Sequence, residues 1–321
     1  MIDLCRDDRD IHLITRGNVD GIVSTAIFLR RFPLSRVSFV TSPSAAAKAL
    51  RRDRISKITY VVDLAPTREV VEAIKAKERM DALVVDHHQP PEASEGLDGM
   101  VIGSGMSAAR VLHEHLGMED ELTDLVAIAD LVEFCRSPGL ERTLEEHGSK
   151  RVFRESKVLD FAWRLNIQDD MFRLRAASRL SNGGWPSEVP MIWSRFMTVQ
   201  NERRWPKALQ VVERRLKKID NIGILELSGK RSTLYGFGSR ALVDVARRKG
   251  CHYTMMVHDR DRHASVSLRA LRDRSENLGR FVESFTDVHG IGGGGHATSA
   301  GARIPKDSTA LLLSDLRELV G

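Results

Sequence analysis

Polar side chains that could bind a cation follow three apolar, β-branched runs near the start of the chain. They are Asn18 and Asp20 after residues 11–15, Asp63 after residues 58–62, and Asp86, His87 and His88 after residues 82–85. In a parallel α/β sheet the carboxyl ends of the strands meet along one edge, so these side chains should gather there. A single Asp after a strand is commonly a helix cap, but clustered carboxylates repel one another unless a cation neutralises them. Asp and His ligands without Cys favour Mn²⁺, Mg²⁺ or Co²⁺ over a structural zinc ion.

A glycine-rich segment near the carboxyl end of the chain is the second chemical signal. Residues 290–305 read GIGGGGHATSAGARIP, with Gly293, Gly294 and Gly295 directly before His296. Consecutive glycines can bring bare backbone N–H groups against an anion, and the histidine adds a side chain for a phosphate. The segment lacks the GK[ST] ending of a P-loop. We therefore expect a phosphate-binding or nucleotide-binding loop that is not of the Walker type.

The elements that must position these residues divide the chain into two domains. Short apolar runs alternate with amphipathic stretches up to about residue 130, which predicts an open α/β domain with a parallel sheet. Helical periodicity then dominates until about residue 220, and strand patterns return at residues 222–227, 233–236, 253–258 and 264–269. The predicted divisions are a first domain over residues 1–195, a connecting helix over 196–220 and a second domain over 221–321.

Composition excludes several classes of protein. The 321 residues are 42% hydrophobic and 29% charged, which fits a globular chain with two cores. The longest apolar runs are too short to span a membrane, and the charged N-terminus is unlike a secretory signal, so we expect a cytoplasmic protein with no membrane partner. Cys5, Cys135 and Cys251 lie far apart, and we interpret them as reduced and structural. The net charge of +5 is compatible with a polyanionic partner.

Five motifs together resemble the DHH phosphoesterase superfamily, in the branch that carries a DHH-associated C-terminal domain. They are TRGNVDGIVSTAI (15–27), VVDLAP (61–66), VVDHHQP (84–90), VAIADLVE (126–133) and GGGGHATSAGARIP (292–305). Ser267, Leu268 and Arg269 resemble the short strand motif whose arginine binds phosphate. The wording TRGNVDG is similar to the THGDVDG of archaeal RecJ-like members, which are the closest in their motifs.

The resemblance implies a two-domain phosphodiesterase or phosphatase that usually depends on Mn²⁺. Its implied fold is a parallel-sheet, Rossmann-like DHH domain, a helical connector and a smaller α/β domain, with the active site in the cleft between the domains. By motif, one metal would be coordinated by Asp20, Asp63, His87 and Asp130, with Asp63 bridging to a second ion. Asp86 would ligate or orient the histidine pair, and His88 would face the substrate phosphate. The nucleotide would be gripped by Arg269, His296 and the glycines 293–295.

The first motif departs from the family at two positions. Where archaeal members have His, Gly and Asp, this chain has Arg16, Gly17 and Asn18. Asparagine keeps an oxygen but loses the charge, and arginine cannot give up its proton to become a ligand. One metal position is therefore compromised, so one or two ions would bind. Arg16 either replaces a metal in part or marks a degraded site, and an engineered substrate trap at Asn18 is a third interpretation.

Three functions follow from these patterns. The first is a divalent-metal phosphodiesterase that acts as an exonuclease or oligonucleotidase on single-stranded DNA or RNA ends, or on short oligonucleotides. The second is a catalytically weakened RecJ-like scaffold that docks replication proteins such as GINS. The third is a nucleotide phosphatase or cyclic dinucleotide phosphodiesterase, because fold alone does not fix the substrate.

Overall fold

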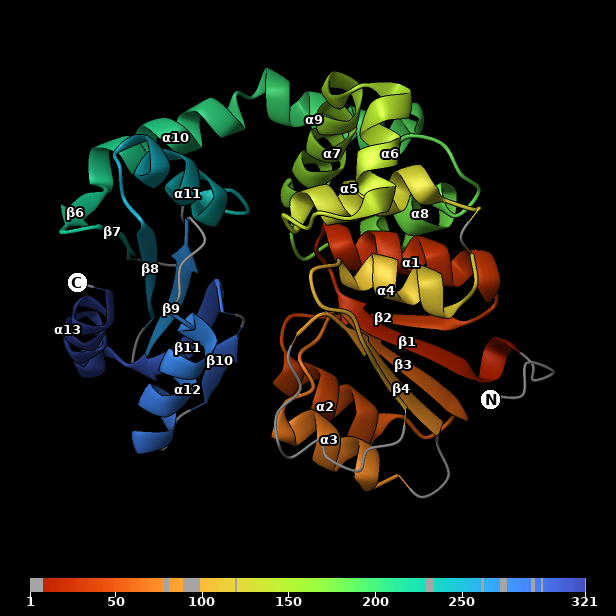
Figure 1. The fold of residues 1–321 in the computed structure, drawn as a ribbon, viewed down its shortest axis with the longest axis horizontal. Helices are drawn as coiled ribbons and strands as arrows, with labels where there is room; N and C mark the ends of the chain where they lie inside the picture. The colour runs from red at the N-terminus through yellow and green to blue at the C-terminus, as the bar shows by residue number, and fades with distance from the viewer. Residues whose placement is uncertain are drawn as a thin grey trace. The chain divides into compact units, whose positions relative to one another are not determined.

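The computed structural model describes residues 8–77, 81–88, 99–118, 120–228, 234–260, 263–271, 276–289, 292–295 and 297–320. The chain divides into two compact units, Met1–Thr198 and Val199–Gly321 (Figure 1). Within the described residues, no helix is long and apolar enough to cross a membrane.

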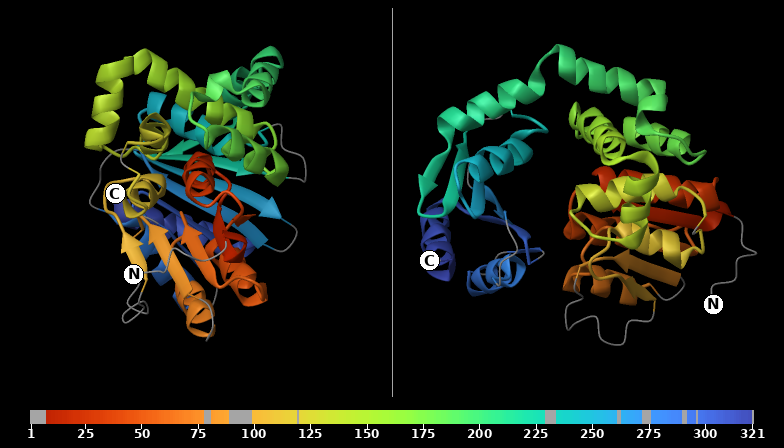
Figure 2. Two further views of the ribbon diagram at one scale, coloured as in Figure 1. Left: turned by 90° about the vertical axis from the view of Figure 1, so that its right-hand side faces the viewer. Right: turned by 45° about the horizontal axis from the view of Figure 1, so that its top comes forward.

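The first unit is built on a sheet of five parallel strands in the order β2-β1-β3-β4-β5. The strands are β1 (Ile11–Arg16), β2 (Arg36–Val40), β3 (Ile58–Val62), β4 (Asp81–Asp86) and β5 (Met100–Ile102). Helices α2 (Pro43–Arg52) and α3 (Arg68–Lys75) cover one face, and α1 (Val19–Arg31) and α4 (Ala108–His115) cover the other (Figures 1 and 2). The predicted parallel sheet with helices on both faces is confirmed.

Alternation along the strands explains the two faces of this sheet. Ile14, Val61 and Val84 are fully buried against α2 and α3. Their neighbours Leu13 and Val85 belong to the larger core formed with α1 and α4. Because successive side chains of a strand point to opposite faces, an apolar run that is buried throughout requires helices on both sides.

Five further helices follow the sheet in the first unit. They are α5 (Thr123–Val132), α6 (Pro138–His147), α7 (Ser149–Arg164), α8 (Asp170–Leu180) and α9 (Pro190–Asn201). They share the larger core, in which Phe172, Trp185 and Ile192 are buried. Helices predicted for this part of the chain are therefore confirmed, and α5 and α8 pack on α1, one of the helices that cover the sheet.

The second unit contains a mixed sheet of six strands in the order β10-β11-β9-β8-β7-β6. Only β7 and β8 pair in parallel among these described strands. The strands are β6 (Lys217–Ile219), β7 (Ile222–Leu227), β8 (Tyr253–Arg260), β9 (His263–Ala270), β10 (Gly293–Gly295) and β11 (Ser299–Pro305). The helices are α10 (Arg204–Arg215), α11 (Gly238–Arg248), α12 (Leu278–Val288) and α13 (Thr309–Val320).

Two predicted elements of this region are wrong in part. The connecting helix expected over residues 196–220 is interrupted after α9 at Asn201 and ends with α10 at Arg215, and Lys217–Ile219 pairs with β7 as strand β6. The strand expected at 233–236 is a turn over the residues described there, in which Phe237 N donates to Leu234 O. Gly236 has a φ of 80°, which breaks an extended run. Leu234, an apolar residue of the expected strand, is buried in this turn.

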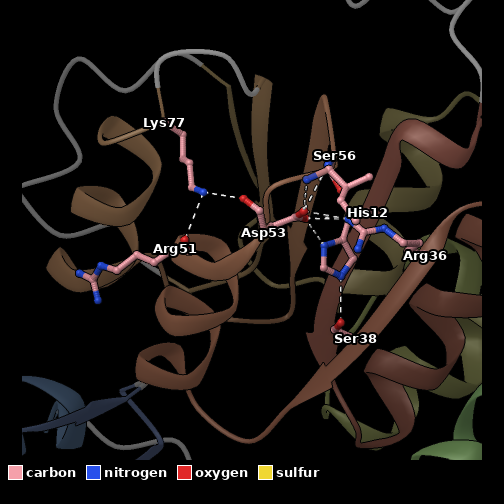
Figure 3. Close-up of polar contacts among 8 residues, drawn as sticks. His12, Arg36, Ser38, Arg51, Asp53, Ser56 and Lys77 are labelled. Carbon is pink, nitrogen blue, oxygen red and sulfur yellow. Dashed lines mark hydrogen bonds and ion pairs between the residues drawn. The ribbon is translucent and has the colours of Figure 1, made fainter.

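A polar network ties β1 and β2 to the end of α2 at the amino-terminal edge of the first sheet (Figure 3). His12 Nδ1 lies 2.6 Å from Asp53 Oδ2, and His12 Nε2 lies 2.9 Å from Ser38 Oγ. Arg36 donates to both oxygens of Asp53, and Lys77 donates to the Asp53 carbonyl. The network gives the buried side chains of His12 and Asp53 hydrogen-bond partners at this edge.

Candidate metal centre

The carboxyl-terminal edge of the first sheet gathers three of the predicted metal ligands. Asp20 follows β1 in the first turn of α1, Asp63 follows β3, and His87 follows β4. One donor atom from each of these side chains lies within 4.8 Å of the other two. Strands β1, β3 and β4 are neighbours in the sheet, which is why residues distant in the sequence meet here.

Asp20 is held by the amino-terminal turn of α4. Its carboxylate is fully buried, and its Oδ2 and Oδ1 accept hydrogen bonds of 2.9 and 2.8 Å from the backbone N–H groups of Ala108 and Ala109. A Cβ at Gly21 would lie 1.8 Å from the Arg16 carbonyl oxygen, so glycine is needed for α1 to start this close to β1. Burial raises the pKa of Asp20 well above its usual value, and the nearby Asp63 adds to the effect.

Asp63 has the surroundings that point most directly to cation binding. Its φ is 55°, a left-handed backbone conformation that is uncommon outside glycine and that concentrates at functional sites. Its side chain is buried, and Oδ2 has no hydrogen-bond partner within the part of the chain that the structure describes. Burial raises the pKa of Asp63 well above its usual value, against the opposing effect of the Arg16 guanidinium. A divalent cation would satisfy this oxygen.

His87 is oriented to present a lone pair to the two carboxylates. Its Nδ1 donates to the Met106 carbonyl oxygen at 2.9 Å, which places the lone pair on Nε2, 3.8 Å from Asp63 Oδ1. A hydrogen bond to the second ring nitrogen is the arrangement that fixes metal-binding histidines. Burial lowers the pKa of His87, but the carboxylates of Asp20 and Asp86 outweigh it and the net shift is upward. Two carboxylates and one imidazole therefore fit a single divalent cation.

Asp86 and His88 lie beside this cluster. His88 Nδ1 is 2.5 Å from Asp86 Oδ2, and both side chains are buried. The rings of His87 and His88 pack edge to face with their centroids 4.9 Å apart. Donor atoms of Asp86, His87 and His88 also lie within 4.8 Å of one another. Asp86 contacts His88, and the two roles predicted for it, metal ligand or orienting residue of the histidine pair, stay predictions.

Asp130, the fourth predicted ligand, does not join the cluster of Asp20, Asp63 and His87. Its Oδ1 accepts hydrogen bonds from Ser107 N at 3.2 Å and Ser107 Oγ at 2.6 Å. Its Oδ2 accepts from Arg110 Nε at 2.6 Å and Ser137 Oγ at 2.5 Å. The carboxylate is thus engaged by protein donors on both oxygens.

The two unusual residues of the first motif have separate positions. Asn18 is the N-cap of α1, where its Oδ1 accepts from Gly21 N at 2.9 Å. Aspartate caps helices as well as asparagine does, so the N-cap role does not explain why this chain has Asn18 where archaeal members have aspartate. Arg16 ends β1 and acts electrostatically on Asp63, and the Asn18 side chain hydrogen-bonds the same carboxylate. Both residues therefore act on the cluster through Asp63, Asn18 by a hydrogen bond and Arg16 by its charge.

Glu133 is a site residue that the sequence patterns did not single out. It follows α5, and its charge raises the pKa of both Asp20 and Asp63. The sequence feature that could have identified Glu133 is its position three residues after Asp130, because residues three apart lie on the same side of a helix. Nearby, burial together with Asp130 raises the pKa of the Cys135 thiol to about 12, which keeps it protonated. The interpretation of Cys135 as structural agrees with this.

The predicted phosphate-binding residues lie in the second unit. The segment Gly293–Gly295 is strand β10 and pairs with β11, so the expected loop is an edge strand. A Cβ at Gly295 would lie 2.3 Å from the Ser299 carbonyl oxygen, which explains the glycine there. Arg269 lies in β9 opposite Ser299 of β11, toward the same end of the sheet as Gly295. His296 lies outside the described residues.

Comparison with known proteins agrees with this architecture. The family model of the DHHA1 domain matches residues 240–321. The pGpG-specific phosphodiesterase PggH from Vibrio cholerae is 18% identical with a TM-score of 0.56, over 95% of this chain and 97% of that protein. A DHH domain described as a member of the S1p family of ribosomal proteins is 16% identical with a TM-score of 0.68, over 98% and 87% of the two chains. The family model thus identifies a DHHA1 domain at residues 240–321, and the two structures share the fold of this chain.

A third structure with a similar fold, RecJ from Thermus thermophilus in complex with Mn²⁺, is larger. It is 17% identical with a TM-score of 0.63, and the match covers 95% of this chain but 51% of RecJ. The sequence matches none of the curated proteins. At these identities the likeness establishes the fold, and the chemistry must be argued from the residues of this chain.

Proposed function

We propose that this chain is a divalent-metal-dependent phosphodiesterase that acts on single-stranded nucleic-acid ends or on short oligonucleotides. The observation that carries the proposal is the buried cluster of Asp20, Asp63 and His87, in which Asp63 Oδ2 has no partner within the described residues. Two adjacent buried carboxylates without a counter-ion are costly, so the cluster is suited to a bound cation.

The proposed ion is Mn²⁺, with Mg²⁺ or Co²⁺ as alternatives, held by Asp20, Asp63 and His87. Such an ion would lower the pKa of a water molecule and neutralise charge on phosphate oxygens. RecJ from Thermus thermophilus was solved with Mn²⁺, and its fold is similar to that of this chain. The mixed carboxylate and imidazole donors present here agree with this choice of metal.

The other residues of the site would bind and orient the substrate. The hydrogen bond to Met106 fixes the ring of His87, and Asp86 fixes the ring of His88. We assign His88 to the substrate phosphate. The guanidinium of Arg16 supplies a fixed positive charge beside Asp63, and such groups stabilise the charge that develops on phosphate oxygens.

The second unit would bind the nucleotide. Arg269 and the glycine strand Gly293–Gly295 belong to one sheet, and His296 follows that strand directly in the sequence. Arginine is suited to bidentate phosphate binding, and glycine permits close approach to a backbone. The net charge of +5 favours a polyanion over a neutral substrate. The name of PggH as a pGpG-specific enzyme supports a short oligonucleotide or dinucleotide as a substrate class.

An activity screen tests the proposal. The full chain is incubated with oligonucleotides of several lengths, labelled at the 5′ or the 3′ end, in Mn²⁺, Mg²⁺ or Co²⁺. We expect release of mononucleotides that is lost in Asp63→Asn and retained in Glu72→Gln, a change of an exposed carboxylate on α3. Absence of release from every DNA and RNA substrate in every metal would exclude an exonuclease or oligonucleotidase.

A second function, a RecJ-like scaffold that docks replication proteins such as GINS, is favoured by two observations. Arg16 and Asn18 replace a charged or ionisable pair of the family motif, and Asp130 is bound to Arg110. Calorimetric titration with Mn²⁺ separates the functions, because a scaffold without a metal site would give no binding heat. Affinity for oligonucleotides that falls steeply with salt would favour a polymeric substrate over a free nucleotide or cyclic dinucleotide.

A further inference from the structure

We infer that Asp130 is a positioning residue that lies outside the coordination set of the metal, and that Arg110 takes the place of a cation on its carboxylate. The inference rests on the proposed metal site. It limits that site to one ion with three protein ligands, Asp20, Asp63 and His87.

The first argument is the number of donors on each carboxylate. An ionised carboxylate offers about four lone-pair sites. Asp130 accepts four hydrogen bonds, two on each oxygen, from Ser107 N, Ser107 Oγ, Arg110 Nε and Ser137 Oγ. Asp20 accepts one backbone bond on each oxygen, and Asp63 Oδ2 accepts none from the described residues. Asp20 and Asp63 therefore keep oxygen lone pairs that could coordinate a metal, whereas all those of Asp130 accept hydrogen bonds.

The second argument is charge. Asp130 is fully buried, and the Arg110 guanidinium that pairs with it is nearly so. The position of this guanidinium is built into the fold, because a Cβ at Gly139 would lie 2.5 Å from Arg110 Nη2. A buried carboxylate needs one compensating positive charge, and Arg110 already provides it. A metal ion on the same carboxylate would place two cationic groups side by side.

The third argument is the path from Asp130 to the metal cluster. Four consecutive residues at the start of α4 bind the two carboxylates, the outer two Asp130 and the inner two Asp20. Ser107 caps the helix and binds Asp130, the N–H groups of Ala108 and Ala109 bind Asp20, and Arg110 returns to Asp130. Asp130 and Arg110 thus hold the turn whose amides set the orientation of Asp20.

The test compares Mn²⁺ affinity and stoichiometry across variants of the full chain by calorimetry, with the electron paramagnetic resonance spectrum of bound Mn²⁺ as a second readout. We expect one ion per chain. Asp130→Asn and Arg110→Met should each weaken binding about 10- to 100-fold, the range for residues that orient ligands. The double variant should be no weaker than the worse single variant, because both changes release the same turn. Asp130→Asn should leave the spectrum unchanged.

Two matched changes separate this inference from the proposed function. Asp63→Asn removes a ligand, so it should abolish Mn²⁺ binding. If wild type binds no Mn²⁺, the proposed function fails and the inference fails with it. If wild type binds Mn²⁺ and Asp63→Asn does not, the proposed site stands and the Asp130 variants decide the inference alone. Arg110→Lys keeps the charge and should recover part of the affinity lost in Arg110→Met.

Three results would overturn the inference while leaving the metal site intact. Arg110→Met could tighten Mn²⁺ binding, which would mean that a freed Asp130 becomes a ligand. Asp130→Asn could abolish binding as fully as Asp63→Asn and change the spectrum, which would place Asp130 on the metal. Asp130→Asn could leave affinity unchanged, which would deny it a positioning role. If Asp130→Asn does not fold, Ser137→Ala, which removes one of the four bonds, takes its place with the same criteria and a smaller expected loss.

Discussion

Replacing Asp63 with asparagine should have opposite effects on stability with and without metal. In the metal-free chain, Asp63 is a buried carboxylate with an unpaired oxygen, next to Asp20. A buried carboxylate oxygen that lacks a hydrogen-bond partner costs about 1–3 kcal/mol. Asparagine has nearly the same size and tolerates a φ of 55°, so the backbone adds little penalty. Asparagine also loses the attraction between Asp63 and Arg16, so we expect the free energy of unfolding to increase by only about 1 kcal/mol.

The gain should be visible as a rise in Tm. For a unit of this size, 1 kcal/mol corresponds to about 2–4 °C. Mn²⁺ at about 100 times its Kd should stabilise the wild type by about 2.7 kcal/mol, or about 5–11 °C, and should leave Asp63→Asn unchanged. The two proteins should therefore exchange their order of stability when metal is added.

Differential scanning calorimetry with and without Mn²⁺ measures both effects in one series. Glu72→Gln serves as the control, because it removes a carboxylate engaged in an exposed i,i+4 pair worth a few tenths of a kcal/mol. A metal-free Asp63→Asn protein that is less stable than wild type would refute the reasoning about the unpaired charge. Equal stabilisation of both proteins by Mn²⁺ would show that the ion binds elsewhere.

Further predictions concern pH and the packing around the cluster. Burial raises the pKa values of Asp20 and Asp63, and neighbouring carboxylates raise the pKa of His87. The three groups therefore stabilise the metal-free protein fully at low pH, and this contribution is lost as pH rises through their raised pKa values. Measurements of the free energy of unfolding from pH 4 to 8 should show this decline. Mn²⁺ affinity should rise over the same interval, since the ion competes with protons, and calorimetry at several pH values checks it. Gly21→Ala should destabilise the chain by about 3 kcal/mol or more in denaturant unfolding, because the added Cβ would collide with the Arg16 carbonyl oxygen. As a control, Gly292→Ala should change stability little, because its Cβ would enter open space. Ser107→Ala removes a helix cap and a bond to a buried carboxylate and should cost about 1–3 kcal/mol in the same assay.

The sequence was sufficient to predict the parallel sheet and the meeting of three of its strand-end residues. Buried β-branched runs locate the strands, and the parallel topology brings Asp20, Asp63 and His87 to one edge. These are consequences of local pattern and of one general rule about sheets. Strand patterns after residue 221 predicted the second domain, and the glycine motif indicated its type, with which the DHHA1 match over residues 240–321 agrees.

Other features depend on tertiary contacts that no local pattern encodes. Arg110 is a helix residue whose pairing with Asp130 requires the packing of α4 against α5 and the space left by Gly139. Glycines 293–295 form a strand because β11 offers a partner, although a glycine run alone indicates a loop. The end of α10 and the start of β6 follow from pairing with β7, which overrides helical periodicity. The four hydrogen bonds to the Asp130 carboxylate become visible only when the positions of its neighbours in space are known.

The central claim is that Asp20, Asp63 and His87 hold one divalent cation. Crystals of the full chain grown with Mn²⁺, measured near the manganese absorption edge, test it directly through the anomalous difference map. The account predicts one peak within bonding distance of all three side chains, with Asp130 still bound to Arg110. A map with no peak at this position, or with the ion on Asp130, would contradict it.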